Sequence, residues 1–107
     1  MFKRERERIY WTRHSLEKMK YYRISPSRVK RIIKSPQRVE EGVAKETIAV
    51  MQRNDRRKKK EELWVMYQLN KKLKIISTWR YPGQSPERKP PPIPKDILEE
   101  LKKTKIL

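Results

Sequence analysis

The chain has 107 residues, which is enough for one domain with a modest core and a tail. Its 30 Lys and Arg against 13 Asp and Glu give a net charge of +17, so a polyanion, above all a nucleic acid, is the expected partner. The alternative is that this charge reflects only a lysine-rich, solvated surface with no polyanionic partner. The absence of Cys excludes disulfides, thiol catalysis and Cys-based zinc sites, and no apolar run approaches a membrane span. We therefore expect a cytoplasmic protein that does not contact membranes.

The first third of the chain predicts a short strand and two helices. Residues 1–8 form an arm of alternating charges, and residues 9–12 are apolar and β-prone. Thr12 is a good N-cap for a helix over His14–Tyr22. Ser25-Pro26 then begins a second helix, because Ser caps well and Pro fits the first helical position.

The centre of the chain predicts an antiparallel meander built from Thr47–Gln52, Leu63–Leu69 and Leu73–Tyr81. If residues 70–72, Asn-Lys-Lys, form a three-residue loop, Leu69 opposes Leu73 and Tyr67 opposes Ile75. This register places seven apolar residues on one face of the sheet: Leu63, Val65, Tyr67, Leu69, Leu73, Ile75 and Trp79. Three more lie on the other face: Trp64, Met66 and Ile76. We therefore expect both faces to be partly covered.

Composition divides the chain into three parts. Residues 1–83 should form an α+β domain in which two N-terminal helices pack on one face of a small antiparallel sheet. Residues 84–94 are rich in proline and predict an extended linker. Residues 95–107 predict a C-terminal helix whose apolar side needs a partner, either its own sheet or another chain.

The candidate nucleic-acid-binding residues lie on the outer face of the second helix and in a hydrophilic loop. They are Arg28, Arg31, Arg56, Arg57, Lys58, Lys59 and Lys60. A basic run in a loop is usually just solvated, but at this net charge a phosphate-binding role is equally reasonable.

Two further places could carry chemistry. One is His14 near the start of the first helix, with Arg23 just after its end; a surface or capping histidine is the alternative. The other is Arg80-Tyr81, where the last strand leaves the sheet. An Arg there can hold a phosphate through two hydrogen bonds. Alternatively, Tyr81 packs on the sheet edge and Arg80 lies in solvent.

The order of the elements resembles that of the small RelE/ParE toxin superfamily, and the local pattern is closer still to BrnT-like and related small toxin-like domains. Three segments carry the resemblance: Thr12–Met19 with its His, Arg23-Ile24-Ser25 at the second helix start, and Ile75–Trp79 in the final strand. The resemblance covers about residues 9–81 and leaves out the proline-rich segment and the last helix.

The resemblance implies a protein that binds RNA, including ribosome-bound mRNA, and cleaves it without a metal while an acidic antitoxin protein holds it inactive. In such enzymes a base helps the ribose 2′-OH attack, and basic groups stabilise the pentacoordinate phosphate. By matching position, His14 or Tyr81 would handle protons, and Arg23 and Arg80 would hold the phosphate. Two alternatives remain: a non-catalytic RNA- or ribosome-binding module with the same fold, and a gyrase-poison-like interaction protein.

No metal or cofactor is expected from this sequence. It contains one His and no Cys, and its acids mostly stand beside bases. With only two glycines it also lacks a glycine-rich phosphate loop.

Overall fold

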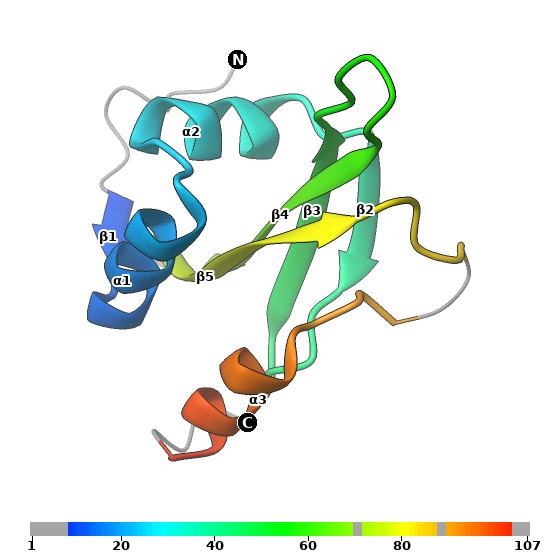
Figure 1. The fold of residues 1–107 in the computed structure, drawn as a ribbon. Helices are drawn as coiled ribbons and strands as arrows, with labels where there is room; N and C mark the ends of the chain where they lie inside the picture. The colour runs from blue at the N-terminus through cyan, green and yellow to red at the C-terminus, as the bar shows by residue number, and fades with distance from the viewer. Residues whose placement is uncertain (1–8, 70–71, 88–89, 104–107) are drawn as a thin grey trace.

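A computed structural model describes residues 9–69, 72–87 and 90–103, which form three helices and a five-stranded sheet (Figure 1). The elements are β1 (Ile9–Trp11), α1 (Arg13–Tyr22), α2 (Pro26–Lys34), β2 (Arg38–Glu41), β3 (Thr47–Arg53), β4 (Glu61–Leu69), β5 (Leu73–Pro82) and α3 (Lys95–Lys103). The strand order is β1-β5-β4-β3-β2. The α+β class is thus confirmed. Among the described helices, none is long and apolar enough to cross a membrane.

The sheet is mixed, so the prediction of an antiparallel sheet is wrong at one edge. The meander β3-β4-β5 is antiparallel as predicted, but β1 lies parallel to β5. Thr12 follows β1 and ties its end to β5, because its hydroxyl donates to the Ile75 carbonyl over 2.7 Å. The same hydroxyl accepts the Ser15 N–H and caps α1, as predicted. The start of α1 therefore fixes where β1 lies against the sheet.

The register of the β4–β5 hairpin is confirmed near its turn and shifts farther along. Leu69 pairs with Leu73 and Tyr67 with Ile75, while residues 70–71 of the predicted loop lie outside the described part of the chain. Between Met66 and Tyr67 the register then slips by one residue, which makes a β-bulge. A one-residue shift exchanges the two faces of a strand. Trp79 therefore opposes Trp64 and lies on the same face of the sheet as Trp64. The prediction that Trp79 shares a face with Val65 and Ile75 is wrong.

Each face of the sheet has its own core. On one face, Met19 of α1 and Val29 and Ile32 of α2 pack against Val65 and Ile75 of the sheet. Ser25 caps α2 and Pro26 occupies its first turn, as predicted.

On the other face, Ile97 and Leu101 of α3 pack against the stacked pair Trp64 and Trp79. All four side chains are fully buried. The apolar side of α3 thus finds its partner in its own sheet. The proline-rich segment leads α3 to that face and contributes Ile93 to the second core.

Candidate nucleic-acid interface

Four arginines and one glutamate gather where α1 ends, α2 begins and β5 leaves the sheet. We call this group the arginine cluster: Arg23, Arg28, Arg31, Arg80 and Glu61. In sequence these residues are spread over helical, loop and strand segments that lie far apart along the chain. The fold therefore assembles the cluster, and its contacts determine which of these side chains can bind a ligand.

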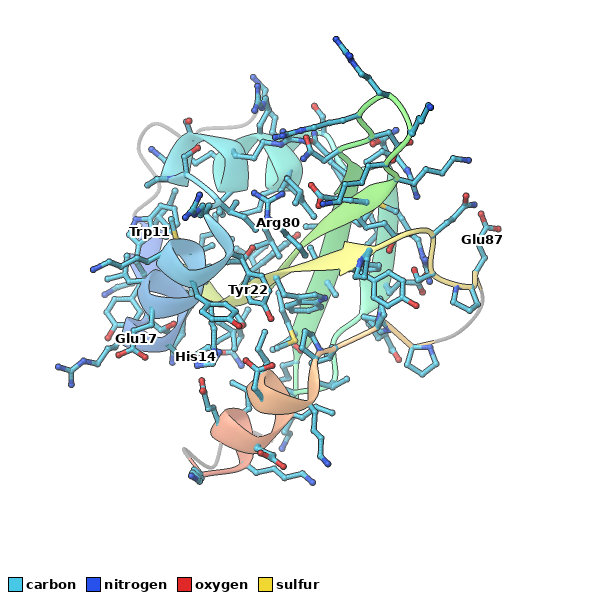
Figure 2. All side chains as sticks on the ribbon, viewed as in Figure 1. Trp11, His14, Glu17, Tyr22, Arg80 and Glu87 are labelled. Atoms are coloured by element: carbon cyan, nitrogen blue, oxygen red, sulfur yellow. The ribbon has the colours of Figure 1, made fainter. Side chains whose placement is uncertain are left out.

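Arg80 reaches from β5 to the end of α1 (Figure 2). Its Nε donates to the Tyr22 carbonyl over 2.6 Å, and its Nη2 donates to the Arg23 carbonyl over 3.0 Å. Its Nη1 bonds the Glu61 carboxylate at 2.5 Å. These carbonyls belong to the last turn of a helix, where the backbone has no partner of its own. Arg80 is thereby held rigidly, with its side chain 27% exposed.

Arg28 lies in the first turns of α2 and is held in a similar way. Its Nη2 donates to the Arg53 carbonyl over 3.2 Å, and its Nη1 donates to the Asn54 side chain over 3.3 Å. Its Nε is buried and has no acceptor among the described residues. Burial, followed by repulsion from Arg31 and Arg80, lowers the pKa of Arg28. The positive charges are therefore close enough to repel, and a bound anion would relieve this repulsion.

Glu61 is the carboxylate of the cluster. It is 9% exposed, and its Oε2 accepts from Arg80 and from the Asn54 side chain, the latter over 2.6 Å. No sequence signal singles it out, because it lies near the end of a charged run that is typical of a loop. Its pairing with Arg80 depends on the hairpin register, which places residues 61–63 beside 80–82.

The predicted basic loop projects between β3 and β4, at the end of the sheet where α2 also lies (Figure 1). Its five basic residues are all exposed: Arg56, Arg57, Lys58, Lys59 and Lys60. Two backbone hydrogen bonds between Arg56 and Lys59 close its tip. The loop thus extends the positive surface of the arginine cluster into solvent.

His14 lies at the opposite end of α1, facing α3 (Figure 2). Its Nε2 is 2.9 Å from the Ser77 hydroxyl, and its Nδ1 is 3.0 Å from Glu100. Burial lowers the pKa of His14, although Glu100 opposes this effect. Arg23 follows His14 by nine positions along the helix, which is about 13 Å along the axis. His14 therefore belongs to the contact between α1 and α3, where Lys18 also pairs with Glu100.

Tyr81 points away from the arginine cluster. Neighbouring residues of a strand face opposite sides of the sheet, so Arg80 lies on the side of α1 and Tyr81 on the side of α3. Tyr81 packs there against the second core. Of the four catalytic candidates, the structure brings the Arg80 guanidinium to the backbone carbonyl of Arg23 and separates the side chains of His14 and Tyr81 from this contact.

The described residues contain no group of His, Cys, Asp and Glu side chains that could hold a metal ion. Comparison with protein-family models, with curated proteins and with solved structures finds no match to this chain. Function is therefore inferred from the arrangement of the side chains.

Proposed function

We propose that this protein binds RNA through the arginine cluster and the basic loop beside it, using a fold of the RelE/ParE type. The observation that carries the proposal is how Arg28 and Arg80 are held. Main-chain carbonyls of Tyr22, Arg23 and Arg53 fix both guanidinium groups. Neutral acceptors orient a cation without cancelling its charge. The one carboxylate of the cluster, Glu61, pairs with Arg80, so four arginines against one glutamate leave the cluster preorganised and positive.

The arrangement suits a phosphate backbone. Arginine presents a planar set of donors that match phosphate oxygens. The exposed loop residues can neutralise further phosphates along the strand and release their counterions. The resemblance of residues 9–81 to RelE/ParE proteins favours RNA over DNA as the polyanion. An acidic protein of the antitoxin kind would compete for the same surface.

The test is binding of a fluorescent, unstructured RNA at several salt concentrations. Replacing Lys58 and Lys59 together by Glu should weaken binding to all sequences alike. Each phosphate that is then no longer neutralised should reduce the slope of log K against log salt by about 0.7. The matched control replaces Lys102 and Lys103 of α3 by Glu, which makes the same charge change away from the cluster. An equal fall in affinity for both variants, or binding that salt does not affect, would contradict the proposal that RNA binds at this surface.

A second candidate function, metal-independent RNA cleavage, is favoured by one observation: Glu61 lies inside the arginine cluster. Glu61 would accept the proton of a ribose 2′-OH as its oxygen attacks the neighbouring phosphorus. Arg28 and Arg80 would stabilise the charge of the pentacoordinate phosphate. The bond to O5′ breaks, O5′ takes a proton from water, and a 2′,3′-cyclic phosphate remains.

Cleavage is tested with the same RNA in the presence of a metal chelator. Glu61→Gln keeps acceptor and donor atoms of similar shape, so it should retain RNA binding while the cleavage rate falls by about 10² to 10⁴. His14→Gln should cleave normally, since His14 lies away from the cluster. If the native chain binds RNA and leaves it intact, with or without ribosomes, the protein is a non-catalytic binding module.

A further inference from the structure

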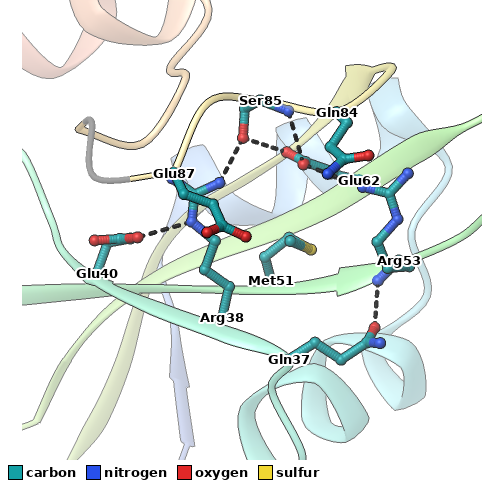
Figure 3. Close-up of a pocket in the computed structure, with 9 residues that line it drawn as sticks. All are labelled: Gln37, Arg38, Glu40, Met51, Arg53, Glu62, Gln84, Ser85 and Glu87. Atoms are coloured by element: carbon teal, nitrogen blue, oxygen red, sulfur yellow. Dashed lines mark hydrogen bonds and ion pairs between the residues drawn. The ribbon is translucent and has the colours of Figure 1, made fainter.

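A pocket lies on the face of the sheet that also carries α3. It has a volume of about 500 Å³ (Figure 3). It is lined by Gln37, Arg38, Glu40, Met51, Arg53, Glu62, Gln84, Ser85 and Glu87. Pockets of this size hold small organic molecules or single nucleotide bases.

The cations of this pocket are already neutralised. Arg38 bonds Glu40 over 2.7 Å, while Arg53 bonds Asp55 over 2.7 Å and Glu62 over 3.3 Å. The lining holds three glutamates against two arginines, although the chain as a whole has a charge of +17. A phosphate would meet more carboxylates than cations here, so the pocket is unlike the arginine cluster.

Hydrogen bonds within the protein hold the wall of the pocket in place without a ligand. Glu62 is fully buried and accepts from Trp64 Nε1 over 2.9 Å. It also accepts from the backbone N–H and the hydroxyl of Ser85, over 2.9 Å and 2.8 Å. These bonds fasten the segment 84–87 to the sheet, so its side chains face the pocket from a fixed backbone.

Three polar groups of the lining remain available. The Glu87 carboxylate and the Gln84 amide have no hydrogen-bond partner among the described residues, and both come from the segment over the pocket (Figure 3). Gln37 uses its oxygen to accept the Arg53 N–H over 2.6 Å, which leaves its amino group unused within the described part of the chain. Met51 supplies an apolar contact. The pocket thus offers one carboxylate, amide groups and an apolar surface.

We propose that this pocket receives an unpaired guanine base of the RNA held at the arginine cluster; the inference rests on the proposed function. Guanine carries two adjacent N–H donors, at N1 and N2, which one carboxylate can accept together. Adenine and cytosine place an acceptor beside their amino group, and uracil flanks its N–H with carbonyls. Glu87 therefore selects guanine, and the amides of Gln37 and Gln84 can donate to its ring and carbonyl acceptors.

Arg53 connects the pocket to the arginine cluster. Its carbonyl accepts from Arg28, and its guanidinium lines the pocket. The arginine cluster and the pocket lie on opposite faces of the sheet, so a strand whose phosphate binds Arg28 would reach the pocket by passing around the end of the sheet at Arg53. Another ligand with paired N–H donors is an arginine side chain of a peptide, but the net charge of +17 repels basic peptides.

The experiment compares short uridine oligonucleotides that carry a central guanosine, inosine or adenosine, or uridine alone. Guanosine should bind about tenfold more tightly than adenosine or uridine. Inosine, which lacks the N2 amino group, should lie between them. Glu87→Gln should abolish the guanosine preference and leave the affinity for plain uridine intact. The matched control, Glu41→Gln, changes an exposed glutamate outside the pocket and should keep the preference.

The possible failures are distinguishable. If no oligonucleotide binds at low salt, the proposed function and this inference both fall. If all four bind equally, RNA binding stands and the guanine pocket is overturned. A short arginine peptide that binds more tightly than the guanosine oligonucleotide, and does so through Glu87, would also overturn it in favour of a peptide site.

Discussion

Arg23 offers a variant in which stability and binding should move in opposite directions. Its backbone has φ 58° and ψ 51°, the left-handed conformation that ends α1. Such a conformation costs a residue with a Cβ about 1–2 kcal/mol, while glycine adopts it freely. Glycine also increases the entropy of the unfolded chain, which reduces this gain in folding stability by about 0.5–1 kcal/mol. Arg23→Gly should therefore stabilise the fold by about 0.5–1 kcal/mol, or raise Tm by about 3–5 °C.

The interactions that hold Arg23 in place run through its backbone. The residue is exposed, and its hydrogen bond with Arg80 uses the backbone carbonyl, which glycine keeps. The backbone bond from Ile24 N–H to the Met19 carbonyl, 2.9 Å long, is also kept. One charge of the arginine cluster nevertheless disappears, so RNA should bind more weakly and with a smaller salt dependence.

The assay is urea unfolding combined with RNA titration, and Lys20→Gly is the control. Lys20 is an exposed residue within α1, where glycine should destabilise by about 1 kcal/mol for the same change of charge. Glu46 also has a left-handed backbone, with φ 60°, so Glu46→Gly should be stabilising without weakening RNA binding. A fall in stability on Arg23→Gly would refute the conformational reasoning, and unchanged RNA affinity would remove Arg23 from the interface.

The other predictions concern groups whose partners are fixed by the fold. Glu62→Ala leaves the N–H groups of Trp64 and Ser85 buried without an acceptor, so urea unfolding should show a destabilisation of about 3–5 kcal/mol. Thr12→Ala removes the cap of α1 and the tie to β5 and should cost about 1–2 kcal/mol in the same assay. Burial lowers the pKa of His14 below its ordinary 6.5, so the unfolded chain takes up this proton more readily. Stability should therefore fall as the pH drops below about 6.5, and His14→Gln should lack this part of the pH dependence; an unchanged profile would contradict it.

Local signals in the sequence predicted the elements well. Thr12 and Ser25 cap the helices they were expected to cap, because a cap depends on residues three positions away. The pairing of Leu69 with Leu73 followed from alternation close to the turn. The bulge near Ile76 has no such signal, since the predicted register simply continued the alternation near the turn along the whole of β5. The side chains of β5 that follow the bulge therefore lie on the face opposite to the one predicted, Trp79 among them.

The candidate site was less predictable, because it depends on contacts between distant residues. Arg80 was singled out by its place at a strand end, but its bonds to Tyr22 and Arg23 require the packing of α1 on the sheet. Glu61 and Glu62 stand side by side in a charged run, yet one joins the arginine cluster and the other anchors Ser85. Their separate roles follow from the alternation of faces once the strand is known to begin there.

The stacked tryptophans have an optical consequence. Trp64 and Trp79 lie with their ring centroids 6.1 Å apart and their planes 6° from parallel, both without solvent exposure beneath α3. Two indoles so placed couple their electronic transitions, which gives a circular dichroism signal that neither ring has alone. Because the chain has three tryptophans, Trp11→Phe would leave this pair as the only indole emitters. Their emission would then shift to longer wavelength when α3 leaves the sheet, so the Trp11→Phe chain can report the docking of its last helix without an added dye.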